Sequence, residues 1–140
     1  MPIKTNRNEL PLSDHVVRYC KPFTLDNKRP TQNSFQLRPG EPSLSVSWLE
    51  FYKDEKLNEK FKKMLQDLRL KWKVTGSMAI LNNNEILINC AKKYNFIISI
   101  YQEKSNDSHS LIEPTDDLLL SKLLSENVME NHSIQNILSN

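Results

Sequence analysis

The sequence contains little glycine: Gly40 and Gly76 are the two glycines among its 140 residues. Phosphate-binding loops need closely spaced glycines, because glycine lets the backbone adopt positive φ and approach a phosphate closely. The sequence also lacks the H-E-x-x-H motif of zinc proteases and the G-x-S-x-G motif of many hydrolases. These absences argue against the common nucleotide-binding and hydrolase families.

Cysteine and histidine are scarce as well. Cys20 and Cys90 are far apart and neither belongs to a C-x-x-C pair, which favours two buried free thiols over a disulfide or a catalytic thiol. His15, His109 and His132 show no metal-ligand spacing with each other or with the cysteines. We therefore expect no metal site and no cofactor.

Long apolar runs are missing too. No stretch approaches the roughly 20 apolar residues that span a bilayer. The polar segment of residues 1–14 lacks the apolar centre of a secretory signal, so we expect a cytoplasmic protein with no membrane contact. The length suits one domain, and 38% hydrophobic with 26% charged residues is typical of a soluble globular chain.

The formal net charge is small, +2, but it is unevenly distributed. Residues 53–73 hold eight Lys or Arg against four Asp or Glu, a net of +4. Residues 102–140 hold two lysines against seven acids, a net of -5. Such asymmetry indicates either a basic contact surface or two faces that attract each other within one fold, and we favour the second.

The periodicity predicts a single α+β domain over residues 15–130, in which two main helices pack on a small mixed or antiparallel sheet. A loosely ordered lead-in (1–14) precedes it, and a frayed tail or short helical turn (131–140) follows. Strands are expected at residues 15–20, 35–37, 44–48, 72–80, 86–91 and 96–101. For the fifth of these, a helical turn over residues 87–93 is the alternative.

Two segments have helical spacing. Between residues 48 and 68 the apolar positions recur at helical spacing, and they comprise Leu57, Phe61, Met64, Leu65 and Leu68. A final leucine-rich helix is expected to be capped by Thr115, Asp116 and Asp117. Residues 82–84, three asparagines, are expected to form a turn.

Polar residues gather around the Pro39-Gly40 pair, which is typical of a type II turn because its third position needs positive φ. Residues 44–48 then alternate, and Ser45 and Ser47 are expected to face away from the apolar side. Alternatively, a helix begins near Ser47, with Ser47 as its N-cap and Glu50 completing a capping box. The turn either exposes backbone N–H groups to an anion or serves only to reverse the chain.

Two further side chains have chemistry that a site would use. Arg18, on the first strand, either binds an anion through its guanidinium or pairs with an acid such as Glu41 or Glu50. His109, in a polar loop of residues 105–110, is either a general base or a solvated surface group. The full candidate cluster is Arg18, Arg38, Glu41, Ser45, Ser47, Trp48, Glu50 and His109.

Four blocks stand out in the sequence: the H-V-V-R-Y run at residues 15–19, L-R-P-G-E at 37–41, L-S-V-S-W-L-E at 44–50 and D-S-H-S-L-I at 107–112. Together they resemble a family of small uncharacterised bacterial proteins. The resemblance covers the first third and the last quarter of the chain. It implies a bacterial origin and a site built from these blocks, which would bring Arg18, Arg38, Glu41, Trp48, Glu50 and His109 together.

Arg18 on the first strand precedes a Ser-x-Ser segment, Ser45-Val46-Ser47, on a later strand. This pattern resembles that of NAD-binding ADP-ribosyltransferase folds. Those enzymes also use a late catalytic Glu or Gln, for which Glu103 is the candidate, although it lacks the usual acid two positions earlier.

Two functions remain open from the sequence. The first is a binding or accessory protein that acts through a protein partner, of the kind encoded in defence or mobile-element operons. The second is a small enzyme directed at a nucleotide or nucleic acid, with Arg18 and Arg38 on phosphate and His109 or Glu50 transferring protons. The two differ in whether Arg18, Arg38 and His109 converge on one concave pocket.

Overall fold

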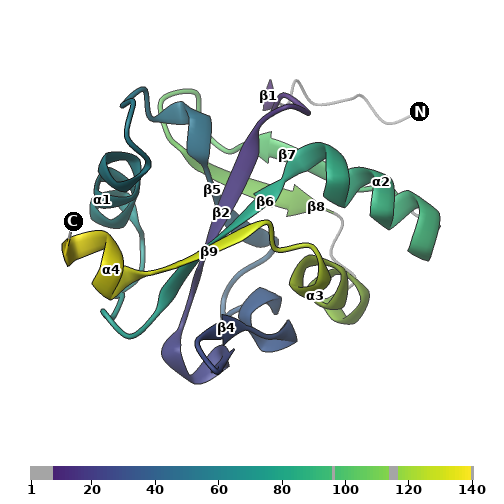
Figure 1. Ribbon diagram of the computed structural model, residues 1–140. Helices are drawn as coiled ribbons and strands as arrows, with labels where there is room; N and C mark the ends of the chain where they lie inside the picture. Colours follow the sequence, from purple (N-terminus) through teal and green to yellow (C-terminus); the bar gives the residue numbers. More distant parts are fainter. Residues whose placement is uncertain (1–7, 96, 114–116, 140) are drawn as a thin grey trace.

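A seven-stranded antiparallel sheet forms the centre of the protein, with strand order β1-β7-β8-β5-β2-β6-β9 (Figure 1). The computed structural model describes residues 8–95, 97–113 and 117–139. The strands of this sheet are β1 (Asn8–Glu9), β2 (His15–Cys20), β5 (Leu44–Trp48), β6 (Ser77–Asn82), β7 (Ser99–Gln102), β8 (His109–Glu113) and β9 (Glu130–Ser133). A separate small hairpin joins β3 (Leu25–Asp26) to β4 (Arg29–Pro30). The predicted α+β single domain is confirmed.

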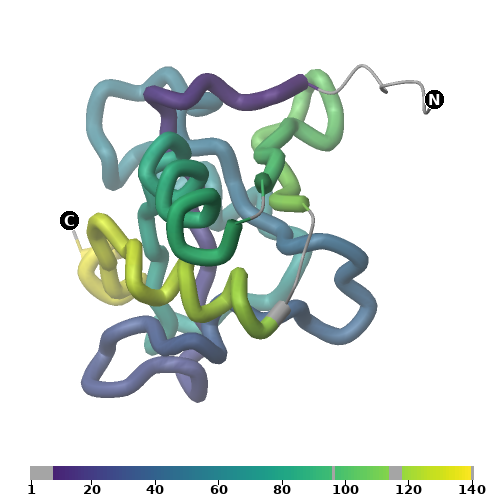
Figure 2. The backbone as a smooth tube through the Cα atoms, turned by 90° about the vertical axis from the view of Figure 1, so that its right-hand side faces the viewer, coloured from purple at the N-terminus to yellow at the C-terminus, as the bar shows by residue number. Residues whose placement is uncertain are grey.

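Helices cover both faces of the sheet. On one face, α2 (Asn83–Tyr94) and α3 (Asp117–Glu126) pack against a core that includes Val16, Leu44 and Ile112 (Figure 2). On the other face, α1 (Leu57–Asp67) and α4 (Ile134–Ser139) pack with Val17 and Tyr19 (Figure 1). Because successive residues of a strand point to opposite faces, β2 supplies both cores.

The central strand β2 has the predicted bounds, and all six of its residues pair with β6. On its other side it pairs with β5, where Val17 is opposite Ser47. The strand β5 also has the predicted bounds, and Gly40 before it has φ 82°. The Glu41 N–H donates to the Arg38 carbonyl at 2.9 Å, which closes the predicted turn.

No helix begins at Ser47, because a short 3-10 turn at Leu49–Phe51 follows β5 and has no side-chain cap. The expected long helix therefore starts at Leu57 and not near Trp48, although Phe61, Met64 and Leu65 are buried as its spacing predicts. The final helix starts at Asp117. The expected cap residues Thr115 and Asp116 lie outside the described residues.

The expected strand at residues 35–37 is wrong, because Gln32–Phe35 forms a 3-10 turn. The Ser34 and Gln36 carbonyls accept hydrogen bonds from the Arg18 guanidinium, at 3.0 and 2.8 Å. One arginine thus satisfies backbone acceptors that a neighbouring strand would otherwise bind.

The expected strand at residues 86–91 is also wrong, and the helical alternative is confirmed by α2. Asn82, expected in a turn, ends β6 and caps this helix by accepting a hydrogen bond from the Glu85 N–H at 3.0 Å. Ile86 and Cys90 are then buried on one helical face. The helix ends at Tyr94, and its C-cap residue Asn95 has a left-handed φ of 57°.

Other element boundaries shift. The expected strand at residues 72–80 is β6, which starts only at Ser77, and that at 96–101 is β7, which starts at Ser99. In the lead-in, β1 pairs with β7, and residues 1–7 lie outside the described part. At the end of the chain, β9 pairs with β6, and Ile134 and Ile137 of α4 are buried.

Candidate functional site

A cavity of about 380 Å³ opens on the sheet face that α1 and α4 cover only in part. Its floor consists of the residues of three adjacent strands that point to this face: Val17 and Tyr19 of β2, Ser45 and Ser47 of β5, and His109 and Leu111 of β8. Its walls are the Arg38–Pro42 turn, residues 67–70 after α1, and Glu103 after β7. Backbone alternation therefore places the two serines in a cavity and not in bulk solvent.

Five of the eight candidate residues line this cavity, namely Arg38, Glu41, Ser45, Ser47 and His109. His109 is the first residue of strand β8. Its expected position in a polar loop is therefore wrong. It is directly opposite Ser47 in the register of β5 and β8. The Trp48 N–H donates to the Ser108 carbonyl at 2.8 Å, so Ser47 and His109 form a non-hydrogen-bonded pair, whose side chains lie close together.

Arg18 is a buried structural residue and does not line this cavity. Its side chain is 1% exposed, and it forms an ion pair with Glu41 at 3.0 Å. The guanidinium also donates to the Ser34, Gln36 and Ser45 carbonyls at 2.8–3.0 Å. Since these bonds occupy its donors, Arg18 has little left to offer a ligand, and the pairing with Glu41 is the alternative that the structure bears out.

Glu41 is saturated by this arrangement. Besides Arg18, it accepts from the Arg38 N–H at 2.7 Å and the Ser45 N–H at 3.2 Å. Burial opposes ionisation of Glu41, but the Arg18 charge and these hydrogen bonds outweigh it and hold the pKa of Glu41 below its ordinary value. Glu41 therefore fixes the turn as an ionised carboxylate.

Arg38 carries the positive charge that remains. Its guanidinium donates to the Tyr19 carbonyl and lies over the Tyr19 ring, 6.0 Å from the centroid. Within the described part of the chain, no carboxylate forms an ion pair with it. Burial and the nearby Arg18 charge lower the pKa of Arg38 to about 10, despite the attraction of Glu41. The wall thus presents a partly desolvated arginine without a bound acid.

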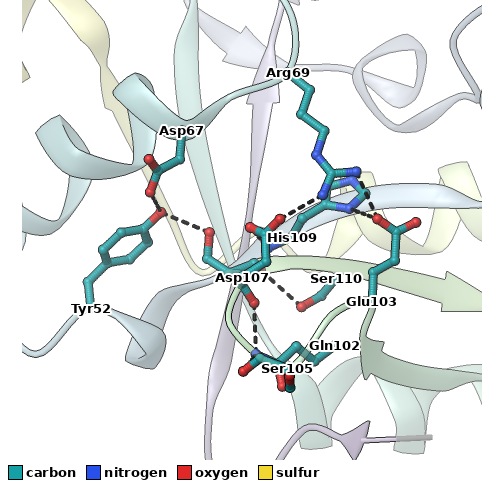
Figure 3. Close-up of polar contacts among 10 residues, drawn as sticks. Tyr52, Asp67, Arg69, Gln102, Glu103, Ser105, Asp107, His109 and Ser110 are labelled. Carbon is teal, nitrogen blue, oxygen red and sulfur yellow. Dashed lines mark hydrogen bonds and ion pairs between the residues drawn. The ribbon is translucent and has the colours of Figure 1, made fainter.

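The opposite wall holds a network in which Glu103 contacts Arg69 and, at the edge of the floor, His109 (Figure 3). The His109 Nδ1 lies 2.8 Å from Glu103 Oε1, and Arg69 Nη1 donates to the same oxygen at 2.8 Å. Burial opposes ionisation of Glu103, but the hydrogen bonds from Arg69 and His109 hold its pKa below its ordinary value. A carboxylate only accepts, so His109 Nδ1 carries a proton. The described residues provide no hydrogen-bond partner for Nε2.

Asp107 and Tyr52 hold this wall in place (Figure 3). Asp107 accepts from Arg69 Nη2 at 2.6 Å and from the His109 N–H at 3.0 Å. The Tyr52 hydroxyl lies 2.6 Å from Asp67 and 2.8 Å from the Ser108 hydroxyl. Burial and the bond to Asp67 raise the pKa of Tyr52 above its ordinary value. The start of β8 is thereby joined to the end of α1.

Trp48 and Glu50 do not line the cavity. The Trp48 Nε1–H donates to Asp14 at 2.8 Å, and Glu50 accepts from the His15 N–H at 2.8 Å and contacts the His15 ring at 2.6 Å. These contacts join the start of β2 to the end of β5 and the turn after it. Because neither side chain reaches the cavity, the neighbourhood implied by the bacterial family resemblance does not include Trp48 and Glu50.

Most of the opposite wall could not be predicted from the sequence. Asp67 and Arg69 belong to no recognisable motif, Asp107 entered only as the first residue of the D-S-H-S-L-I block, and Glu103 entered only through the ADP-ribosyltransferase resemblance. Glu103 shares the cavity with Ser45 and Ser47, whereas Arg18 does not line it. Cys20 and Cys90 are free and buried, as the sequence predicts.

Comparison with protein-family models, with curated proteins and with solved structures finds no match for this chain. Among the residues that the structure describes, no group of three or more His, Cys, Asp or Glu side chains could hold a metal ion. Within the same residues, no helix is long and apolar enough to cross a membrane.

Proposed function

We propose that this protein binds a small anionic ligand, bearing a phosphate or a carboxylate, in the cavity over β5 and β8. The observation that supports the proposal is that Arg38 has a partly buried guanidinium with no ion pair to a described acid. Two arginines, Arg18 and Arg38, lie near one carboxylate, and Glu41 forms its ion pair with Arg18. A partly desolvated guanidinium without a bound acid attracts an anion strongly, because water screens it poorly.

The two walls suit different ends of such a ligand. The anionic group would lie against Arg38, near the Ser45 and Ser47 hydroxyls, which can donate to it. A neutral polar group would lie against His109, because Glu103 and Asp107 make that wall unfavourable for a second anion. In the neutral ring, the His109 Nε2 accepts a hydrogen bond, and it donates once protonated.

This proposal keeps the binding role that the sequence favours and replaces the protein partner with a small anion. The enzymatic alternative expects Arg38 and His109 in one pocket, and both residues line the proposed binding cavity. Arg18, the third residue expected on the ligand, acts indirectly by occupying Glu41.

The test is an NMR titration of the protein with inorganic phosphate and with adenosine 5′-monophosphate. We expect saturable shifts of the Arg38, Ser45, Ser47 and His109 resonances. Arg38→Gln should weaken binding at least about tenfold, since hydrogen bonds to charged groups contribute roughly 1.5–3 kcal/mol. Arg29→Gln, in the β3–β4 hairpin outside the cavity, is the matched control. Unchanged affinity in Arg38→Gln would refute the proposal.

A further inference from the structure

Phe23 is an aromatic side chain that is exposed to solvent. It is 82% exposed, the highest value among the exposed large hydrophobic side chains of the described residues. Its turn, Pro22–Thr24, is well anchored, because the buried Thr24 donates from both its N–H and its hydroxyl to the Lys21 carbonyl, at 2.9 and 2.7 Å. The Ser34 hydroxyl donates to the Thr24 hydroxyl at 2.8 Å. The ring is therefore exposed to solvent from a backbone that hydrogen bonds hold in place.

Lysines surround this ring. A second cavity, of about 330 Å³, is lined by Tyr19, Lys21, Pro22, Phe23, Lys71 and Lys73. In the described part of the chain, none of these three lysines forms an ion pair. The sequence places Lys71 and Lys73 in the basic segment of residues 53–73, and Lys21 beside Phe23. The fold thus brings cations from two distant segments around one exposed aromatic ring.

The Phe23 surface adjoins the cavity over β5 and β8. Tyr19 lines both that cavity and the second one. Arg38 and Pro39 line the first cavity and also a third, of about 300 Å³, which includes Lys21 and Phe23. A ligand whose anion lies on Arg38 could therefore extend directly onto the lysines and the Phe23 ring.

We propose that the ligand is a single-stranded oligonucleotide, with one phosphate on Arg38, a neighbouring phosphate among Lys21, Lys71 and Lys73, and an unpaired base stacked on Phe23. This inference rests on the proposed function and names its ligand class. Single-strand binding sites combine a cationic path along the backbone with aromatic rings that stack on bases. An unpaired strand presents base faces to such a ring, whereas a duplex keeps its bases stacked internally.

The experiment is fluorescence anisotropy of a labelled ten-residue oligothymidylate titrated with the full chain. We expect saturable binding, with a log Kd against log salt slope of magnitude about 1.4 for the two phosphates placed on Arg38 and on the lysines. Phe23→Ala should weaken binding roughly tenfold, in line with the loss of one stacked base, and Phe23→Trp should preserve it. Lys71→Gln should weaken binding and lower the salt slope.

Lys92→Gln is the matched control, because Lys92 is an exposed lysine of α2, on the opposite face of the sheet. The inference is overturned if Phe23→Ala and Phe23→Ala/Lys71→Gln bind the oligonucleotide as the unchanged protein does. It is also overturned if poly-glutamate competes as well as oligothymidylate, since a peptide polyanion has no base to stack. Phosphate binding without oligonucleotide binding would refute this inference alone. Oligonucleotide binding that Phe23→Ala weakens and Arg38→Gln leaves unchanged would refute the phosphate contact on Arg38 that both proposals share, and phosphate binding unchanged in Arg38→Gln would refute the cavity proposal.

Discussion

Replacing Arg18 by alanine should destabilise the fold severely, although the residue is near the proposed site. The substitution removes the ion pair with Glu41 and the hydrogen bonds to the Ser34, Gln36 and Ser45 carbonyls. Ser34 and Gln36 belong to a segment outside the sheet and Ser45 belongs to β5, so Arg18 joins that segment to the sheet. The change leaves a carboxylate and several acceptors poorly satisfied in a region that excludes water.

The magnitude follows from burial. Removing one partner of a buried ion pair costs about 3–5 kcal/mol, because the other charge stays buried. With a urea m-value of roughly 2 kcal/mol per molar, the unfolding midpoint should fall by about 1.5–2.5 M. Arg18→Lys should lose a substantial part of this stability despite its charge, since an ammonium cannot reproduce the planar fork of donors.

The assay is urea unfolding followed by circular dichroism at pH 7, with Arg69→Ala as the control. Arg69 also pairs with two acids, Glu103 and Asp107, at 2.8 and 2.6 Å. Its side chain is 46% exposed, against 1% for Arg18. Exposed ion pairs contribute about 0–1 kcal/mol, so the control should change the midpoint little. If Arg18→Ala cost no more than Arg69→Ala, the argument from burial would be refuted.

Two further predictions concern the stability of variants at Glu41 and at the two glycines, and the same urea unfolding assay measures them. The pKa of Glu41 is lowered in the folded state, so its stabilisation is present above pH 4.5 and is lost as the pH falls through the folded value. Glu41→Gln should therefore unfold more easily at pH 7 and lose less stability between pH 5 and 3; an unchanged pH profile would contradict this. A Cβ on Gly76 would lie 2.7 Å from Tyr19 Cε1 and 2.8 Å from the Cys20 carbonyl, so Gly76→Ala should cost about 1–3 kcal/mol. Gly40→Ala meets open space and should cost only about 1 kcal/mol for its positive φ, and an equal loss in both variants would contradict the steric reasoning.

Local patterns predicted the parts of the fold that depend on one periodicity. Strand β5 alternates between core and cavity, and β2 is a short β-prone run closed by Pro22, so both bounds followed from the residues. Helix α2 was harder, because Ile86 and Ile88 are β-branched residues that favour strands. The deciding contact was the Asn82 cap, which the sequence shows only as one of three asparagines.

The candidate site was predictable on one wall only. The Pro39-Gly40 turn and the two serines are local features, and both lie at the cavity. Arg69 and Glu103 meet across 34 residues, and their contact depends on where the segment after α1 lies against the loop between β7 and β8. No periodicity encodes that placement. Trp48 and Glu50 are sequence neighbours of the serines, but Trp48 ends β5 and packs on the other face of the sheet, and Glu50 lies in the turn that follows.

The pairing of Arg18 with Glu41 leads to a prediction with two opposite effects. Glu41→Gln removes the negative charge that offsets the two arginines, so the free energy of unfolding should fall while the affinity for inorganic phosphate should rise. A gain of about two- to tenfold is reasonable for losing one like charge at the partly screened edge of the cavity. The check is the phosphate titration of the folded variant, with Glu9→Gln on the exposed edge strand β1 as the control. A loss of affinity in Glu41→Gln would mean that Glu41 positions the anion site more than its charge opposes the ligand, and the electrostatic account of Arg38 would then be wrong.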